Sequence, residues 1–210
     1  MRAGVGIVVV IIVAACAMAG ESDAFRSATA GFEITKPADW HYLTAEQNQE
    51  NLSRVELTDD EYKEALLKYA TVPLVAMVKY AEPFDDLNPS VKVNIKPLGE
   101  LKGMAATEIL SIFIPQLEKL FQDFEVAEGP QPVEVSGFPA GYLRVHYNLR
   151  VGDELIFPTA SELWIVPRGD YFFLIGAGTR QDEKTGGRDE IRSILATMRI
   201  EPQPSDESGK

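Results

Sequence analysis

The most regular pattern in the chain is an apolar stripe near its middle, where hydrophobic residues recur at steps of three and four. This spacing places them on one face of an α-helix. Proline lacks the amide proton that a helix interior uses, so we expect Pro115, which lies off the stripe, to bend or split this helix. The stripe consists of Ala106, Ile109, Leu110, Phe113, Leu117, Leu120, Phe121 and Phe124.

Three strands are predicted after this helix. Residues 142–150 and 154–166 flank Val151-Gly152-Asp153, and residues 171–177 follow Arg168-Gly169-Asp170. Both breaks have the composition of tight turns, so the three strands form an antiparallel meander. A last amphipathic helix is predicted from four apolar residues on one face. They are Ile191, Ile194, Leu195 and Met198.

The first half of the chain predicts short strands and polar helices. Alternation predicts strands around Phe32 and Ile34 and over 91–95, and a continuous apolar run, closed by Pro83, predicts a strand over 74–78. The first strand turns through Pro37-Ala38-Asp39 into a buried Trp40. Two pairs have the spacing of a helix capping box: Thr44 with Gln47, and Thr58 with Glu61. After the second pair, an apolar helical face is predicted from Tyr62, Leu66 and Tyr69.

Helices that face a mostly antiparallel sheet make an α+β protein, and here we expect the sheet to be packed between helices in an α-β-α layered sandwich. The opening Gly31-Phe32-Glu33-Ile34-Thr35-Lys36-Pro37-Ala38-Asp39-Trp40 resembles the first strand and turn of the PsbP/Mog-type fold family. The predicted order of elements over 31–200 also resembles that fold, as found in its uncharacterised bacterial lipoproteins. The resemblance implies a fold and no particular activity.

The N-terminus has the build of an export signal. Arg2 is followed by an uncharged run over 3–20, and Val13-Ala14-Ala15-Cys16 resembles a bacterial lipobox around the only cysteine. We therefore predict a signal peptide over 1–15 and lipid attachment at Cys16. Two alternatives stay open: cleavage after Ala17-Met18-Ala19, and an uncleaved membrane anchor, since 18 apolar residues just span a bilayer.

The remaining boundaries follow from composition. Residues 16–30 are small and polar after the cysteine, which predicts a lipid anchor and flexible tether. One folded PsbP-like domain is expected over 31–200. Residues 201–210 contain no apolar side chain and predict a disordered tail.

Charge and motifs narrow the function classes. The formal net charge is −12, which argues against nucleic acid as a partner. The sequence contains no dinucleotide or phosphate-binding glycine motif, no zinc-protease motif and no nucleophile elbow. With one cysteine and two histidines, we predict no catalytic residues, no metal and no cofactor.

One strand carries the best candidate binding face. Because side chains alternate across a strand, residues 142–150 separate an apolar face from a polar one. The polar face has the chemistry to grip an anion or an acidic partner. The alternative interpretation is a solvated face whose arginines pair with nearby acids. The polar residues are Tyr142, Arg144, His146, Asn148 and Arg150.

Two further motifs have simpler structural explanations. Asp85-Asp86-Leu87-Asn88 offers oxygen ligands of the kind calcium prefers, but few of them and in a proline-bounded turn. Arg168-Gly169-Asp170 spells an integrin-type tripeptide, but its place between two strands accounts for it as a hairpin turn.

These observations predict a non-enzymatic binding or accessory lipoprotein of the bacterial envelope. Its expected partners are a membrane, held through the lipid on Cys16, and a protein, with the periplasmic side of the outer membrane as its location. The alternative is a secreted or tethered anion binder or hydrolase that uses the Arg144, His146 and Arg150 face.

Overall fold

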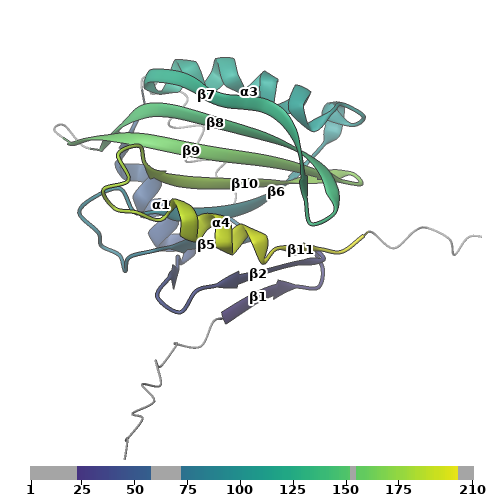
Figure 1. The fold of residues 1–210 in the computed structure, drawn as a ribbon, viewed down its shortest axis with the longest axis horizontal. Helices are drawn as coiled ribbons and strands as arrows, with labels where there is room; N and C mark the ends of the chain where they lie inside the picture. Colours follow the sequence, from purple (N-terminus) through teal and green to yellow (C-terminus); the bar gives the residue numbers. More distant parts are fainter. Residues whose placement is uncertain (1–22, 58–71, 152–154, 203–210) are drawn as a thin grey trace, which may run out of the picture.

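The computed structural model describes residues 23–57, 72–151 and 155–202 (Figure 1). Within them the chain runs through short N-terminal elements, one long helix, four long strands and a short closing helix. The elements are β1 (Asp23–Ser27), β2 (Phe32–Lys36), β3 (His41–Tyr42), α1 (Ala45–Arg54), β4 (Val55–Glu56), β5 (Val75–Val78), β6 (Ser90–Pro97), a 3-10 turn (Gly99–Leu101), α3 (Ala106–Leu120), β7 (Gln122–Val135), β8 (Phe138–Val151), β9 (Leu155–Arg168), β10 (Tyr171–Arg180), α4 (Arg188–Ala196) and β11 (Arg199–Ile200).

The main sheet has the order β3-β5-β6-β10-β9-β8-β4, with β7 also paired to β8. All its pairs are antiparallel. The predicted meander is confirmed as β8-β9-β10, and β7 extends it by one strand (Figure 1). The register sets Arg144 of β8 opposite Glu162 of β9.

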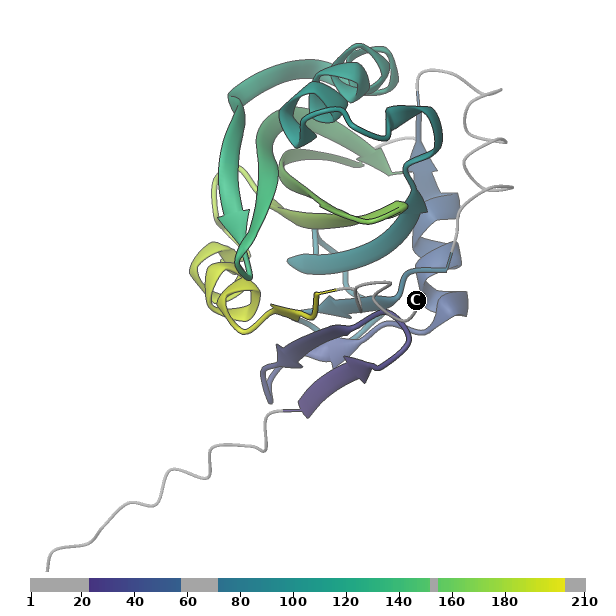
Figure 2. The same cartoon turned by 90° about the vertical axis from the view of Figure 1, so that its right-hand side faces the viewer.

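The two faces of this sheet are covered differently (Figure 2). On one face α3 packs Ile109 and Leu110 against Leu143 and other apolar residues of β8 and β9. Gly141 permits this approach, because a Cβ there would lie 2.8 Å from the backbone of Ala106. On the other face α4 and a small sheet bury a second apolar cluster. Its largest side chains include Trp40, Phe173, Ile34 and Ile194. The α+β layered class is confirmed.

The small sheet corrects the predicted tether. Its order is β1-β2-β11, and β1 pairs with β2 from Asp23↔Lys36 to Ser27↔Phe32. The folded part therefore begins by Asp23 and not at residue 31. Sequence pattern missed this strand because it is short and polar. Its hydrogen bonds to β2 and the packing of Phe25 against the core hold it in place.

The long helix and the strand after it also differ from expectation. Pro115 lies inside α3 without splitting it, and the helix ends at Leu120, so Phe124 belongs to β7. Strand β7 was not predicted. Gly129, Pro130 and several bulges interrupt its alternation, which removes the period-two signal.

The remaining helix predictions fare unevenly. The Thr44–Gln47 capping box begins α1 as expected, with reciprocal bonds of 3.0 and 3.2 Å. Helix α4 buries Ile191 and Ile194, whereas Met198 lies just past its end. The capping box at Thr58 and the apolar face that follows it lie outside the described residues.

Candidate functional site

The polar face of β8 exists as predicted, but it is not an open surface. The apolar residues Leu143, Val145 and Tyr147 are buried on the α3 side. The five polar-face residues, which point away from α3, are all buried or half-buried. They have different neighbours and fall into three groups.

Tyr142 belongs to the packing of the domain. It is buried, and its ring lies 5.1 Å from that of Trp164. Burial raises the pKa of the Tyr142 hydroxyl, and the neighbouring Glu162 carboxylate raises it further. The hydroxyl therefore stays protonated and presents a donor to the neighbouring Glu162 carboxylate.

Asn148 and Arg150, at the other end of the face, are bonded to the start of β7. The Asn148 amide donates to Asp123 over 2.7 Å, and Arg150 donates to Gln122 over 3.3 Å. These bonds fix the position of β7 on β8. They leave Arg150 Nε buried without a hydrogen-bond acceptor among the described atoms.

Arg144 and His146 form the centre of a polar cluster with two residues from other elements. Glu162 of β9 lies across the strand pair from Arg144, and Arg188 lies in the first turn of α4. Arg188 Nε lies 3.6 Å from Glu162 Oε1, with side chains only 16% and 10% exposed. We call Arg144, His146, Glu162 and Arg188 the central cluster.

The geometry fixes the tautomer of His146. Arg144 Nη2 lies 3.1 Å from His146 Nε2. Since arginine is only a donor, Nε2 accepts and the ring proton is on Nδ1, 3.5 Å from Glu125 Oε1. Burial lowers the pKa of His146, and the Arg144 charge lowers it further. His146 is therefore neutral near pH 7.

Two guanidinium groups of the central cluster carry buried N–H groups that make no hydrogen bond to the described atoms. They are Nε of Arg144, and Nε and Nη2 of Arg188. Of these, Arg188 Nε faces Glu162 Oε1 at 3.6 Å, which is an ion-pair distance and too long for a hydrogen bond. Arg188 Nη1 is engaged by Glu183 over 2.8 Å. An arginine cannot give up its proton, so these donors favour an oxygen acceptor. The central cluster thus has unused donors of the kind that bind carboxylates or phosphates.

Sequence analysis missed both Glu162 and Arg188. Each lies far along the chain from Arg144, and neither sits in a motif. Glu162 could be linked to Arg144 only through the β8-β9 register, which depends on the length of the hairpin turn between them. Arg188 reaches the sheet because Gly186 and Gly187, both with positive φ, turn the chain into α4.

The other candidate motifs are used structurally. The two histidines lie on β3 and β8, five strand positions apart, or about 24 Å along the sheet. Asp86 accepts from Arg180 over 2.7 Å. Asn88 exchanges hydrogen bonds with the backbone of Tyr80. Across the described ranges, no three His, Cys, Asp or Glu side chains are grouped to hold a metal.

The integrin-type tripeptide is a hairpin turn that also closes the domain. Gly169 has φ +66°, and Arg168 is buried. Arg168 donates to the carbonyls of Ala30, Glu201 and Pro202. The predicted tail from residue 201 is therefore held as far as Pro202, and 203–210 lie outside the described residues.

Cys16 also lies outside the described residues, so its predicted lipid attachment stays a prediction. None of the helices within the described ranges combines the length and the apolar character that crossing a membrane requires.

Comparison of the whole chain with known proteins identifies its fold. No protein-family model and no curated protein matches the sequence. The structure is similar to cyanobacterial PsbP (CyanoP) from Synechocystis, with a TM-score of 0.52, 13% identity and 96% and 98% of the two chains covered. It is also similar to LpqN, involved in cell envelope biogenesis of Mycobacterium tuberculosis, with a TM-score of 0.51, 14% identity and 87% and 91% covered. The chain therefore has the PsbP/Mog-type fold.

Proposed function

We propose that this PsbP/Mog-type chain is an exported, non-enzymatic accessory protein of the bacterial envelope, held to a membrane by lipid on Cys16. The periplasmic side of the outer membrane is the proposed location. The lipobox-like Val13-Ala14-Ala15-Cys16 supports the anchor. Six residues lie between Cys16 and Asp23, where β1 begins, and these seven residue-to-residue steps reach at most about 25 Å. The domain would therefore lie close to the membrane.

The binding role rests on one observation, the unused guanidinium donors of Arg144 and Arg188. We infer that the central cluster accepts an acidic group, a carboxylate or a phosphate, from a protein partner. Hydrolase activity at the same face has less support than binding. A general base needs a free nitrogen near its substrate, whereas His146 Nε2 faces an Arg144 N–H at 3.1 Å.

The anchor is tested by the intact mass of the mature protein. We expect a chain that starts at Cys16 and carries the added mass of acyl chains. Cys16→Ser should abolish that mass, whereas Ala19→Leu, which blocks the competing Ala17-Met18-Ala19 site, should leave it unchanged. A mature chain that begins at Gly20, or that retains Met1, contradicts the anchor.

The binding face is tested by thermal unfolding with inorganic phosphate and with a short glutamate peptide. A ligand of the folded state raises the melting temperature. We expect this rise to be lost in the Arg144→Met, Arg188→Met double variant and kept in Arg26→Met, whose side chain is 70% exposed on β1. An equal rise in the double variant would remove the central cluster as the site.

A further inference from the structure

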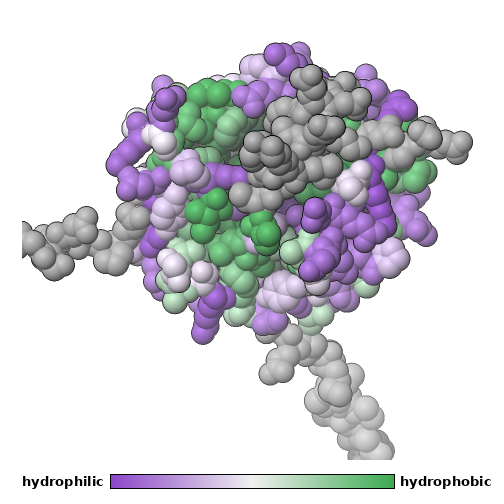
Figure 3. Space-filling view, turned by 180° about the vertical axis from the view of Figure 1, so that it is seen from behind, coloured by the Kyte–Doolittle hydropathy of each residue, from purple (hydrophilic) through white to green (hydrophobic). Residues whose placement is uncertain are grey.

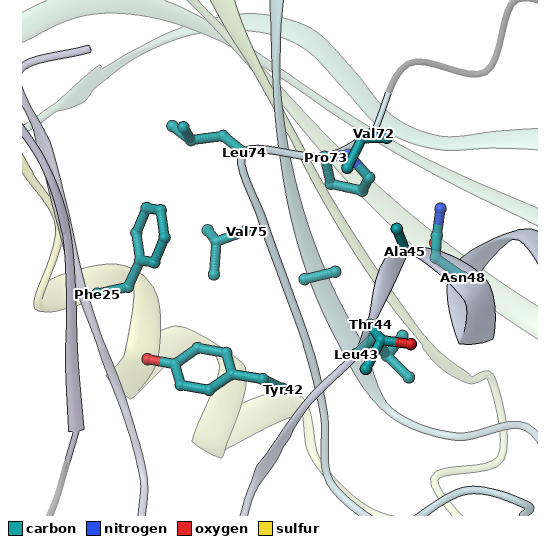
Figure 4. Close-up of a pocket in the computed structure, with 11 residues that line it drawn as sticks. Phe25, Tyr42, Leu43, Thr44, Ala45, Asn48, Val72, Pro73, Leu74 and Val75 are labelled. Carbon is teal, nitrogen blue, oxygen red and sulfur yellow. The ribbon is translucent and has the colours of Figure 1, made fainter. Parts of the chain in front are cut away.

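A recess lies at the other end of the sheet from the central cluster. It is bounded by β1, β3, the start of α1 and the residues that lead into β5, and it holds about 230 Å³ (Figure 4). Phe25 stands at one end and Asn48 at the other, with Tyr42, Leu74 and Val75 between them. None of the described residues that line it is charged.

One polar atom in this recess has no hydrogen-bond partner among the residues that the structure describes. Asn48 is 7% exposed, and its Oδ1 accepts no hydrogen bond from them. The capping box at Thr44 fixes the first turn of α1 and so holds Asn48 at the recess. A buried acceptor without a donor is costly, because it has lost its water. The recess therefore offers apolar walls and one acceptor, which suits a group that is apolar over most of its surface and carries one N–H or O–H.

The size of the recess limits what fills it. Sites for drug-sized ligands hold about 300–1,000 Å³, so this recess fits a smaller group, of the size of one side chain. A tryptophan or tyrosine side chain is a rigid apolar ring with a single donor, and such side chains are frequent anchors of protein interfaces. The mouth is also apolar: Val72 on its rim is 71% exposed. The face turned away from the viewer in Figure 1 carries patches of apolar surface among polar ones (Figure 3).

We propose that this recess binds one aromatic side chain with a hydrogen-bond donor, tryptophan or tyrosine, presented by a protein partner. The ring packs between Tyr42 and Leu74, and its N–H or O–H donates to Asn48 Oδ1. This inference rests on the proposed function in taking the protein partner as the source of the ring. The recess is distinct from the central cluster, which would take an acidic group.

The test uses free side-chain analogues on the mature protein in lipid nanodiscs, with isoleucine, leucine and valine methyl groups labelled for NMR. Indole and p-cresol should shift the methyl signals of Leu43, Leu74 and Val75. Benzothiophene has the shape of indole without the N–H. It should bind about 2- to 10-fold more weakly, the range expected for one hydrogen bond.

Three variants separate the contributions. Asn48→Leu should remove the preference for indole over benzothiophene while leaving benzothiophene binding unchanged. Ala45→Trp places a ring at the exposed mouth and should abolish binding of both. Gln49→Trp, also exposed and on the same helix but outside the recess lining, is the matched control and should bind normally.

Three outcomes overturn the proposal: no methyl shifts with indole or p-cresol, an unchanged indole preference in Asn48→Leu, or 1-decanol binding more tightly than indole, which would identify a lipid-chain site. The proposed function fails on other measurements, namely the intact mass and the Arg144→Met, Arg188→Met variant. The two failures are therefore distinguishable.

Discussion

The two faces of β8 are built from alternate residues of one strand, yet they are stabilised in different ways. On the α3 face, Leu143 and Val145 are almost completely buried among apolar neighbours. On the opposite face, Arg144 and His146 are half-buried beside Glu162 and Arg188. In close apolar packing a loss of volume costs stability. The polar face instead depends on ion pairs and hydrogen bonds, and it contains N–H donors that meet no acceptor among the described residues. Only the second face has chemistry left for a ligand.

The largest expected effect is on the apolar face. Leu143→Ala should lower the free energy of unfolding by about 2–5 kcal/mol, because Leu143 is fully buried under α3 and the change leaves a cavity. Urea unfolding followed by circular dichroism measures the loss. A loss below about 1 kcal/mol would mean that α3 does not pack on β8 as described.

A smaller loss is expected when the charge balance of the polar face is broken. Glu162→Gln removes the acid that lies between Arg188 and Tyr142, and we expect it to cost about 1–3 kcal/mol. Replacing Arg188 by Met in the same chain should recover part of this loss, since it removes a half-buried charge that, among the described residues, keeps only its ion pair with Glu183 once residue 162 is neutral. If the double variant is less stable than Glu162→Gln alone, the two side chains are not coupled in this way.

Protonation of His146 on the polar face should make the stability of the protein depend on pH, with an effect of intermediate size. The pKa of His146 is lower in the folded state than its ordinary value of 6.5. The unfolded chain therefore binds the proton more readily, so stability falls as pH drops below about 6.5 and through the folded pKa. Each unit of pKa lowering corresponds to about 1.4 kcal/mol.

The comparison of wild type with His146→Gln isolates this effect. The groups that face the imidazole are Arg144, Glu125 and Arg188. Acids with lowered pKa values, such as Asp182 at about 2, act at lower pH in both proteins. Between pH 7 and 5 the variant should lose less stability than wild type in thermal unfolding. Parallel curves would show that His146 is not desolvated.

The smallest effect is expected where the polar face meets β7. Asn148→Ala removes an exposed bond to Asp123, and we expect a change within about 0.5 kcal/mol. Chemical unfolding measures it beside Glu162→Gln. A loss as large as that of Glu162→Gln would place the stability of the polar face in its outer end and not in the central cluster.

Local patterns predicted the elements whose signal lies in their own residues. The stripe of α3, the Thr44 capping box and the alternation of β8 are all properties of one segment, and each was found. Strands β1 and β7 were missed because pairing with a neighbour, not periodicity, makes them strands. The fold was indicated by the Gly31–Trp40 stretch.

For the same reason, only two of the four residues of the central cluster were predicted from the sequence. Arg144 and His146 follow from alternation within β8, whereas Glu162 and Arg188 reach them through strand register and the turn into α4. The sequence of β8 alone also could not show that Tyr142 is buried against Trp164 or that Asn148 is tied to Asp123. Which neighbours cover a face is a property of the whole fold.

The attachment of β1 has a mechanical consequence for a chain held at Cys16. Tension from the membrane would enter at Asp23, whose register partner Lys36 lies at the same end of the β1-β2 pair. Such a load would break the β1-β2 pairing from this end, one register position after another. Residues 23–31 would then form a free segment at most about 30 Å long before β2 is reached. Unpairing of β1 would thus lengthen the connection to the bilayer and let the domain move away from it while the main sheet stays folded.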